Sequence, residues 1–356
     1  MLKKATALFL VCASTAIWVS CGAISNNYLY MSIPASNEIV IYREDPNSGI
    51  LTQLAGSPIT AGSAVQSLVI HPSKKLLFAA NAGESDVSMF TIAASGAITE
   101  ITPRTVVGTA PTILAMDSAG QYLYVGNSGS LNISVFSINA TAATPTLTQV
   151  AGSPFSIGLS PINMAVSPSG NFLYVTGTGS PGYIEAFSLN QGVPSVVAGS
   201  PYFTGTGPYG LVIAPSGGFL YTANKLDNSL SEFTINSDGS LTQFSNSPLG
   251  QQYAGPVTLL IDRSGKYMFV ADQGASNVAA YSIGTNGALT LLANSPFSTG
   301  SEPSVLATDS GGKYVFVGNQ SSPVIQSFNL DTSSGILTSV LKYSLPGSPT
   351  SIATTP

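Results

Sequence analysis

The chain has 356 residues, of which 44% are hydrophobic and 8% are charged, and its formal net charge is −5. This much apolar material excludes a disordered chain, and the lack of any Lys/Arg cluster after residue 4 excludes a basic nucleic-acid-binding surface. Abundant glycine and proline favour short strands and tight turns over helices.

The first 20 residues have the pattern of a secretion signal. A short positive region at Lys3 and Lys4 precedes an apolar stretch from Ala5 to Val19. That stretch is shorter than a membrane-spanning helix normally is. We therefore predict that residues 1–20 form a signal peptide and that the protein is exported.

The end of this segment, Trp18-Val19-Ser20-Cys21, resembles a bacterial lipobox, although Trp18 stands where leucine is usual. In such a motif the cysteine is acylated, so we expect lipidation at Cys21, with residues 21–26 as a short tether to the cell envelope. An ordinary cleaved signal peptide is the alternative. Gly22 favours the outer membrane or a periplasm-facing position. Cys12 lies inside the leader, so no disulfide is expected in the mature domain.

After the leader, one unit recurs seven times. It contains a small apolar strand, a turn, an aromatic strand, a polar loop, an alternating strand, a Gly turn and a tail ending in Ser-Pro. The last aromatic of the second strand falls at positions 30, 78, 124, 174, 221, 269 and 316, so the gaps run from 46 to 50 residues. This period is typical of a four-stranded propeller blade. In the sixth unit we expect strands over 257–262, 267–271, 278–283 and 288–292.

The two chain ends predict how the ring closes. The N-terminal unit enters at its aromatic second strand, with no inner strand before it. Residues 350–354 repeat the inner-strand pattern of residues 304–308, and the chain then stops. We therefore expect an all-β, seven-bladed β-propeller over residues 27–356, with the C-terminal strand completing the first blade.

The repeats carry Tyr221-Thr222-Ala223-Asn224, Tyr174-Val175-Thr176 and several Pro-Ser-Gly-like turns. This pattern resembles the YVTN-type repeat and the seven-bladed lactonase family, which includes bacterial 6-phosphogluconolactonases. The resemblance covers residues 27–356 and implies a lactone hydrolase that uses Arg, His and Glu. The matching positions here hold Tyr209, Gly210 and Lys225, so the catalytic motif is not retained and we predict no catalytic residue.

The remaining residues of the sequence do not indicate another catalytic site. His71 is the only histidine, and it lies in a turn between an inner and a second strand. We therefore interpret it as a turn residue on the opposite face from the binding loops. No nucleophile elbow or zinc motif is present, and we predict no cofactor and no metal. Calcium at the loop carboxylates Glu84, Asp86, Asp227 and Asp272 is a weaker alternative to their simple solvation.

Propellers commonly bind partners on the face that carries the loops between second and third strands and the crossings between blades. Tyr202, Tyr209 and Tyr253 lie in crossings of adjacent units, where they could stack on sugars or peptide side chains, or alternatively cap the core. With Lys225, Asp227 and Asp272 they form the predicted ligand-binding set. We expect a binding or scaffold module for an unknown protein or carbohydrate, touching membrane only through its lipid. The alternative is a lactone hydrolase with a divergent site.

Overall fold

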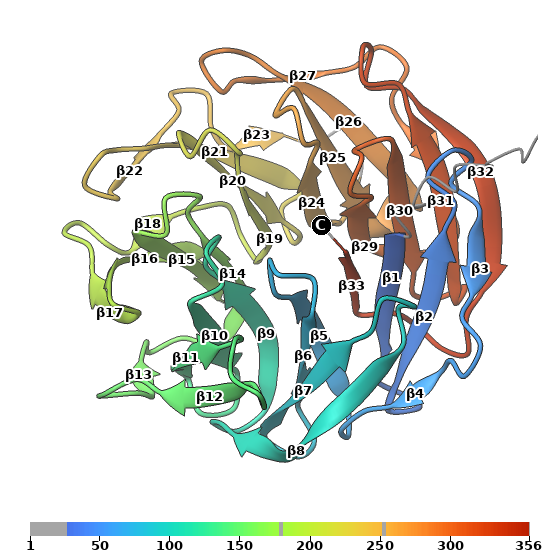
Figure 1. The fold of residues 1–356 in the computed structure, drawn as a ribbon. Helices are drawn as coiled ribbons and strands as arrows, with labels where there is room; N and C mark the ends of the chain where they lie inside the picture. Colours follow the sequence, from blue (N-terminus) through green and yellow to red (C-terminus); the bar gives the residue numbers. More distant parts are fainter. Residues whose placement is uncertain (1–26, 178–180, 251–253, 356) are drawn as a thin grey trace, which may run out of the picture.

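The computed structural model describes residues 27–177, 181–250 and 254–355. In these ranges the strands form seven antiparallel sheets arranged as a ring around a central channel (Figure 1). The predicted all-β, seven-bladed propeller is therefore confirmed. The signal peptide, the tether and Cys21 fall outside the described residues. Within the described ranges, no helix is long and apolar enough to cross a membrane.

Each blade begins with an inner strand at the channel, followed by the aromatic second strand. The inner strands are β33 (Ser351–Thr354), β5 (Val65–Ile70), β9 (Pro111–Met116), β14 (Pro161–Val166), β19 (Pro208–Ile213), β24 (Pro256–Ile261) and β29 (Pro303–Thr308). The second strands are β1 (Asn27–Ile33), β6 (Leu76–Asn81), β10 (Tyr122–Asn127), β15 (Phe172–Gly177), β20 (Phe219–Asn224), β25 (Tyr267–Asp272) and β30 (Tyr314–Asn319). The sixth blade therefore follows its sequence prediction to within one residue at these strands.

The two outer strands complete each sheet. The third strands are β2 (Glu38–Glu44), β7 (Asp86–Ile92), β11 (Asn132–Asn139), β16 (Tyr183–Asn190), β21 (Ser229–Ile235), β26 (Asn277–Ile283) and β31 (Val324–Leu330). The fourth strands are β3 (Leu51–Gln53), β8 (Ile98–Val106), β12 (Thr146–Gln149), β17 (Val193–Val196), β22 (Leu241–Gln243), β27 (Leu289–Leu291) and β32 (Leu337–Ser344). One short 3₁₀ helix, η1 (Gln273–Ala275), follows β25.

The Ser-Pro tails have a structural role. In five blades the tail leads into a two-residue strand that pairs with the third strand: β4 (Ile59–Thr60), β13 (Phe155–Ser156), β18 (Tyr202–Phe203), β23 (Leu249–Gly250) and β28 (Phe297–Ser298). The serine hydroxyl accepts a hydrogen bond from a third-strand amide, as Ser57 Oγ does from Ile41 N at 2.8 Å. These tails therefore cover third-strand backbone that would otherwise lie open to pairing with another chain.

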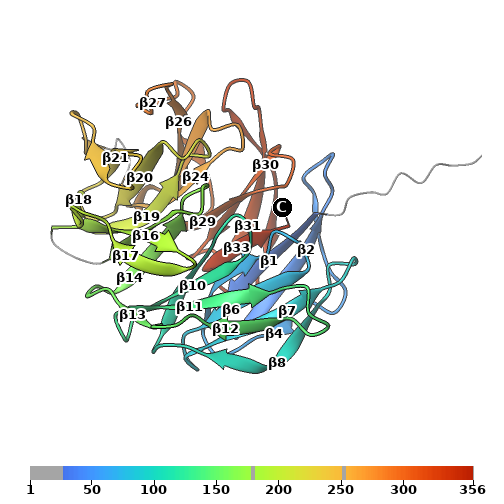
Figure 2. The same ribbon diagram turned by 60° about the vertical axis from the view of Figure 1, so that its left-hand side comes forward.

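The ring closes through the C-terminal strand. β33 pairs antiparallel with β1, with Ser351 opposite Ser32 and Thr354 opposite Leu29. Thr355 then extends the pairing, because its amide donates to the carbonyl of Tyr28 at 2.9 Å and its hydroxyl accepts from the amide of Tyr28 at 3.0 Å. Figures 1 and 2 both show the red C-terminal strand beside the blue β1. The predicted closure is thus confirmed.

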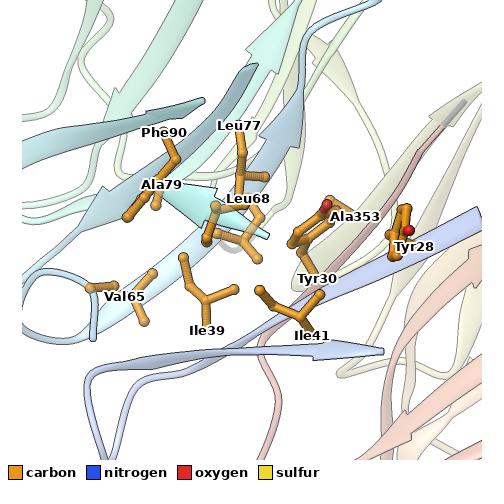
Figure 3. Packing of buried hydrophobic residues seen from close by; sticks show 12 residues of the cluster. Tyr28, Tyr30, Ile39, Ile41, Val65, Leu68, Leu77, Ala79, Phe90 and Ala353 are labelled. Atoms are coloured by element: carbon orange, nitrogen blue, oxygen red, sulfur yellow. The ribbon is translucent and has the colours of Figure 1, made fainter. Parts of the chain in front are cut away.

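Neighbouring blades pack through the aromatic side chains of the second strands. Tyr30, from blade one, is fully buried and donates to the carbonyl of Gly96 in blade two at 2.9 Å. Figure 3 shows Tyr30 and Ile39 facing Leu68 and Leu77 of blade two. Across the closure, the ring of Tyr314 in blade seven covers Gly49 of blade one, where no Cβ would fit. The same contact recurs between neighbouring blades around the ring, for example between Tyr28 and Gly96 and between Phe219 and Gly287.

Candidate ligand site at the channel mouth

The start of each inner strand aims one side chain into the channel mouth. Six inner strands contain a register shift at their first residues, and in blade five it lies between Pro208 and Gly210. Such a bulge turns the side chain of the extra residue out of the regular pairing pattern of the two strands. With Thr350 from the closing strand, the extra residues form a ring at the mouth: Gln66, Thr112, Ile162, Tyr209, Val257 and Ser304.

These side chains line a cavity of about 420 Å³. That volume lies in the range of small-molecule sites. Loop residues on the same face complete the wall, including Ser128, Gln273 and Gln320. Among the described residues, the wall contains hydroxyls, amides, aliphatic side chains and one tyrosine ring, but no carboxylate, imidazole or ammonium group.

Several hydroxyls of the cavity wall hold neighbouring blades together. Thr112 Oγ1 donates to the carbonyl of Pro161 at 3.2 Å, and Thr258 Oγ1 donates to that of Ser304 at 2.5 Å. Across the closure, Thr350 Oγ1 donates to the carbonyl of Gln66 at 2.8 Å. Because these donors are already used between blades, the amides remain as the main directional donors available to a ligand.

The amides fall into two groups. The side-chain amides of Gln66 and Asn163 have no hydrogen-bond partner among the described residues and are half-buried at the wall. Gln273 and Gln320 instead form a chain with Lys225: Lys225 Nζ donates to Gln273 Oε1 at 2.7 Å, and Gln273 Nε2 donates to Gln320 Oε1 at 2.8 Å. The chain links blades five, six and seven.

Tyr209 is the aromatic element of the site. Its side chain is 44% exposed, and Lys225 Nζ lies 5.3 Å from the centroid of its ring. An ammonium group at this distance is attracted by the ring face. Tyr209 and Lys225 therefore contact each other within blade five, and Tyr209 presents an apolar surface to the cavity.

Gly210 contributes backbone only, and the packing of blades five and six explains why. A Cβ at this position would lie 2.6 Å from the carbonyl oxygen of Val257 and 3.3 Å from Cα of Thr258. Both obstacles are backbone atoms of β24, which cannot move without shifting the inner strand. No larger side chain fits here in the observed arrangement.

Lys225, Asp227, Asp272 and Tyr202, which were also predicted to bind a ligand, do not line the cavity. Asp227 joins its loop to the crossing before β19, because its carboxylate accepts from Ser229 Oγ at 2.7 Å and from Thr206 N at 2.6 Å. Tyr202 is half-buried on β18, at the outer part of the blade, and its hydroxyl donates to the carbonyl of Ala198. Tyr253 lies outside the described residues.

Asp272 is fully buried at the end of β25, and neither carboxylate oxygen has a hydrogen-bond partner among the described residues. Burial raises the pKa of its carboxyl to about 8. It therefore faces protein rather than the cavity. Four other blades place an asparagine at this strand end, as Asn127 does in blade three, where Nδ2 donates to Asn132 Oδ1 and Ser134 Oγ.

His71 lies in the turn between β5 and β6, as predicted. Its Nδ1 lies 2.8 Å from Ser73 Oγ, and its Nε2 lies 2.9 Å from the carbonyl oxygen of Gly120 in blade three. The equivalent Asp262 caps the same turn in blade six by accepting from the amide of Tyr267 at 2.7 Å. In the part of the chain that the structure describes, no three His, Cys, Asp or Glu residues are placed to hold a metal ion.

Sequence analysis missed Gln273 and Gln320. Both directly follow the end of a second strand, as Lys225 does in blade five, at spacings of 48 and 47 residues. Aligning the repeats at this position would have placed all three side chains on one arc of the mouth. A single glutamine does not indicate a functional site in a sequence, because its side chain has neither charge nor acid–base chemistry.

Comparisons with known proteins agree with the architecture. The family model described as "Lactonase, 7-bladed beta-propeller" matches residues 25–158, 143–301 and 279–354. Among solved structures, the periplasmic gluconolactonase PpgL of Pseudomonas aeruginosa has a TM-score of 0.76 and 22% identity, covering 93% of this chain and 99% of its own. A candidate 6-phosphogluconolactonase of Bacteroides fragilis has a TM-score of 0.77 and 20% identity, covering 93% and 98%. Among curated proteins, no relative matches this sequence.

Proposed function

This chain belongs to the seven-bladed β-propeller lactonase family, and we propose that within it the protein binds a carbohydrate at its channel mouth without catalysing a reaction. The cavity wall supports this proposal. Amides and hydroxyls can each donate and accept hydrogen bonds, which matches the hydroxyl groups of a sugar. The exposed ring of Tyr209 offers the apolar surface on which a sugar ring packs.

The same wall argues against hydrolysis. Opening a lactone requires a group that activates water and a group that handles the leaving oxygen, usually imidazole, carboxylate or a metal ion. The described wall residues include neither of those side chains. The nearest candidates are Lys225, which is hydrogen-bonded to Gln273, and the phenol of Tyr209.

Binding is tested by titrating the purified protein with a panel of mono- and disaccharides in a calorimeter. We expect Tyr209→Ala to weaken binding about tenfold, since stacking contributes on the order of 1 kcal/mol. Leu226→Ala is the matched control, because Leu226 is 72% exposed on the adjacent loop but does not line the cavity. Equal losses in both variants would argue against the tyrosine platform.

Lactone hydrolysis is the second candidate, favoured by family membership and by the relatives described as gluconolactonases. It is tested by following the acid released from glucono-δ-lactone and from its 6-phosphate with a pH indicator. An enzyme should exceed the rate in buffer, and Tyr209→Ala and Lys225→Ala should both slow it. Rates equal to buffer alone would remove this candidate.

We further propose that the protein is exported and anchored at the cell envelope through a lipid on Cys21. The leader sequence supports this, and the relative from Pseudomonas aeruginosa is described as periplasmic. Cys21→Ser should abolish incorporation of labelled palmitate and release the protein from the membrane fraction. A protein partner remains the alternative ligand. Capture of an envelope protein by wild type, but not by a Tyr202/Tyr209/Tyr253 triple-alanine variant, would favour it.

A further inference from the structure

The hydrogen-bond chain at the mouth has a fixed direction. The ammonium group of Lys225 can only donate, so Gln273 must present its carbonyl oxygen to Lys225. Gln273 is then left with its NH₂ group toward Gln320, which must in turn present its own oxygen. The NH₂ group of Gln320 therefore ends the chain as a donor, and no acceptor for it exists among the described residues.

The charge at the start of the chain strengthens the donor at its end. Hydrogen bonds in series polarise one another, and the effect is larger when the first donor is charged. Lys225 makes no ion pair with any residue that the structure describes. Among the described residues, the ammonium group of Lys225 contacts the side-chain oxygen of Gln273 and the ring of Tyr209. Lys225 therefore brings an ammonium group without an ionic partner among the described residues to the arc formed by blades five to seven.

Three acidic groups lie beside this arc. Asp227 accepts from Thr206 N and Ser229 Oγ, and Asp272 is fully buried. Glu302, in the crossing before β29, accepts from Ser321 Oγ at 2.5 Å, and its carbonyl accepts from the amide of Gln320. The Glu302 side chain is exposed and is not part of the cavity wall. Solvent therefore screens its charge in part. Gln320 is exposed as well, but it lines the cavity directly.

We propose that the cavity selects sugars that carry a carboxylate, that is, hexuronates, with the carboxylate accepting from the Gln320 amide while the sugar ring packs on Tyr209. This inference rests on the proposed carbohydrate-binding function and specifies its ligand class. A carboxylate is favoured over a phosphate ester, because a phosphate dianion is usually held by several donors or by guanidinium groups. The described wall residues offer neutral amides and hydroxyls but no guanidinium or ammonium group, and Lys225 acts only through Gln273.

The test is calorimetric titration of the purified protein with D-galacturonate, methyl β-D-galactoside and galactose 6-phosphate. Galacturonate should bind at least tenfold more tightly than the neutral galactoside at low salt, and its affinity should fall with added NaCl. Lys225→Met and Gln320→Leu should each weaken the binding of galacturonate at least fivefold more than they weaken the binding of the galactoside. Glu302→Gln should tighten galacturonate.

Lys266→Met is the matched control. Lys266 is exposed in the turn between β24 and β25, so this substitution removes the same positive charge at a position away from the cavity. Equal weakening by Lys225→Met and Lys266→Met would overturn the inference. Equal binding of the acidic and neutral sugars, or tighter binding of the phosphate ester, would also overturn it. Neither result would contradict the proposed carbohydrate-binding function. Binding of no sugar at all would remove both proposals. If Lys225→Met unfolds, Gln320→Leu decides alone.

Discussion

Gly210 of β19 lies against the backbone of β24, and any Cβ there would approach the carbonyl oxygen of Val257 to 2.6 Å. The inner strands of blades five and six can approach this closely only because position 210 has no side chain. The histidine that the family resemblance places at this position is therefore incompatible with the present packing.

This contact predicts that Gly210→His is destabilising. Two strands must separate to admit the imidazole, so we expect the free energy of unfolding to fall by about 2–4 kcal/mol. Gly218→Ala is the control, because the nearest atom to its Cβ is the Ser216 hydroxyl oxygen at 3.7 Å. Urea unfolding measures both. A Gly210→His variant as stable as wild type would show that β24 can shift.

Glu44 predicts a pH-dependent stability. It is 1% exposed at a position where the third strands of other blades place Ile92, Ile235 or Leu330 in the same register. Burial, reinforced by the nearby charge of Asp309, raises the pKa of its carboxyl from 4.5 to about 8. The folded state then holds this proton more tightly than the unfolded chain, so stability falls as pH rises from about 4.5 to about 8.

We expect Glu44→Leu to be stabilising by about 2–4 kcal/mol at pH 8 and to show a much smaller advantage at pH 5. Chemical denaturation at the two pH values measures the difference. Glu302→Gln, an exposed carboxylate, should show no comparable change between them. An advantage for Glu44→Leu that grows toward acid pH would contradict the assignment of a buried protonated carboxyl.

Asp272 leads to a related prediction through a hydrogen bond. Asn277 Oδ1 has no partner among the described residues, whereas the equivalent Asn132 Oδ1 accepts from Asn127 Nδ2 at 2.8 Å. Asp272→Asn should create this bond and remove a buried carboxyl, raising the melting temperature at pH 8 more than at pH 4.

The reciprocal change, Asn224→Asp, is the natural comparison. Asn224 Nδ2 donates to Ser229 Oγ and Ser231 Oγ, both at 2.9 Å, so the substitution removes two donors from a buried site. We expect a loss of about 1–3 kcal/mol at pH 8. If both substitutions shifted the melting temperature in the same direction, the two strand ends would not share a preference for an asparagine side chain.

Closure of the ring can be tested by truncation. Removing residues 350–356 should expose the inner edge of β1, lower the free energy of unfolding by several kcal/mol and promote aggregation. Thr355→Ala is the milder partner variant. It removes only the hydroxyl that accepts from Tyr28 N and should cost about 0.5–1.5 kcal/mol. Light scattering during a thermal melt distinguishes the two. A monomeric truncated protein with unchanged melting would refute closure by β33.

The repeat spacing was sufficient to predict the number of blades, the meander in each and the pairing of residues 350–354 with β1. These features follow from local periodicity, because every unit must bury the same aromatic strand against its neighbour. The position of His71 in a turn was predictable for the same reason, since the equivalent residues of the other repeats lie in the turn between the inner and second strands.

The site depended on relations between blades that no single unit contains. Of the predicted ligand-binding residues, Tyr209 lines the cavity, whereas Lys225, Asp272 and Tyr202 do not. Whether a side chain at the end of a strand faces the channel or the core is decided by bulges and by the packing of adjacent inner strands.

The amino-acid sequence by itself determined that this chain forms a closed ring of seven similar sheets, because burial of repeated aromatic strands depends only on spacing and composition. Only the tertiary structure decided that Lys225, Gln273 and Gln320 form one directed chain and that position 210 admits no side chain. Hydrogen-bond direction and backbone proximity arise between residues 47 or 48 positions apart, and their geometry exists only once neighbouring blades have packed together.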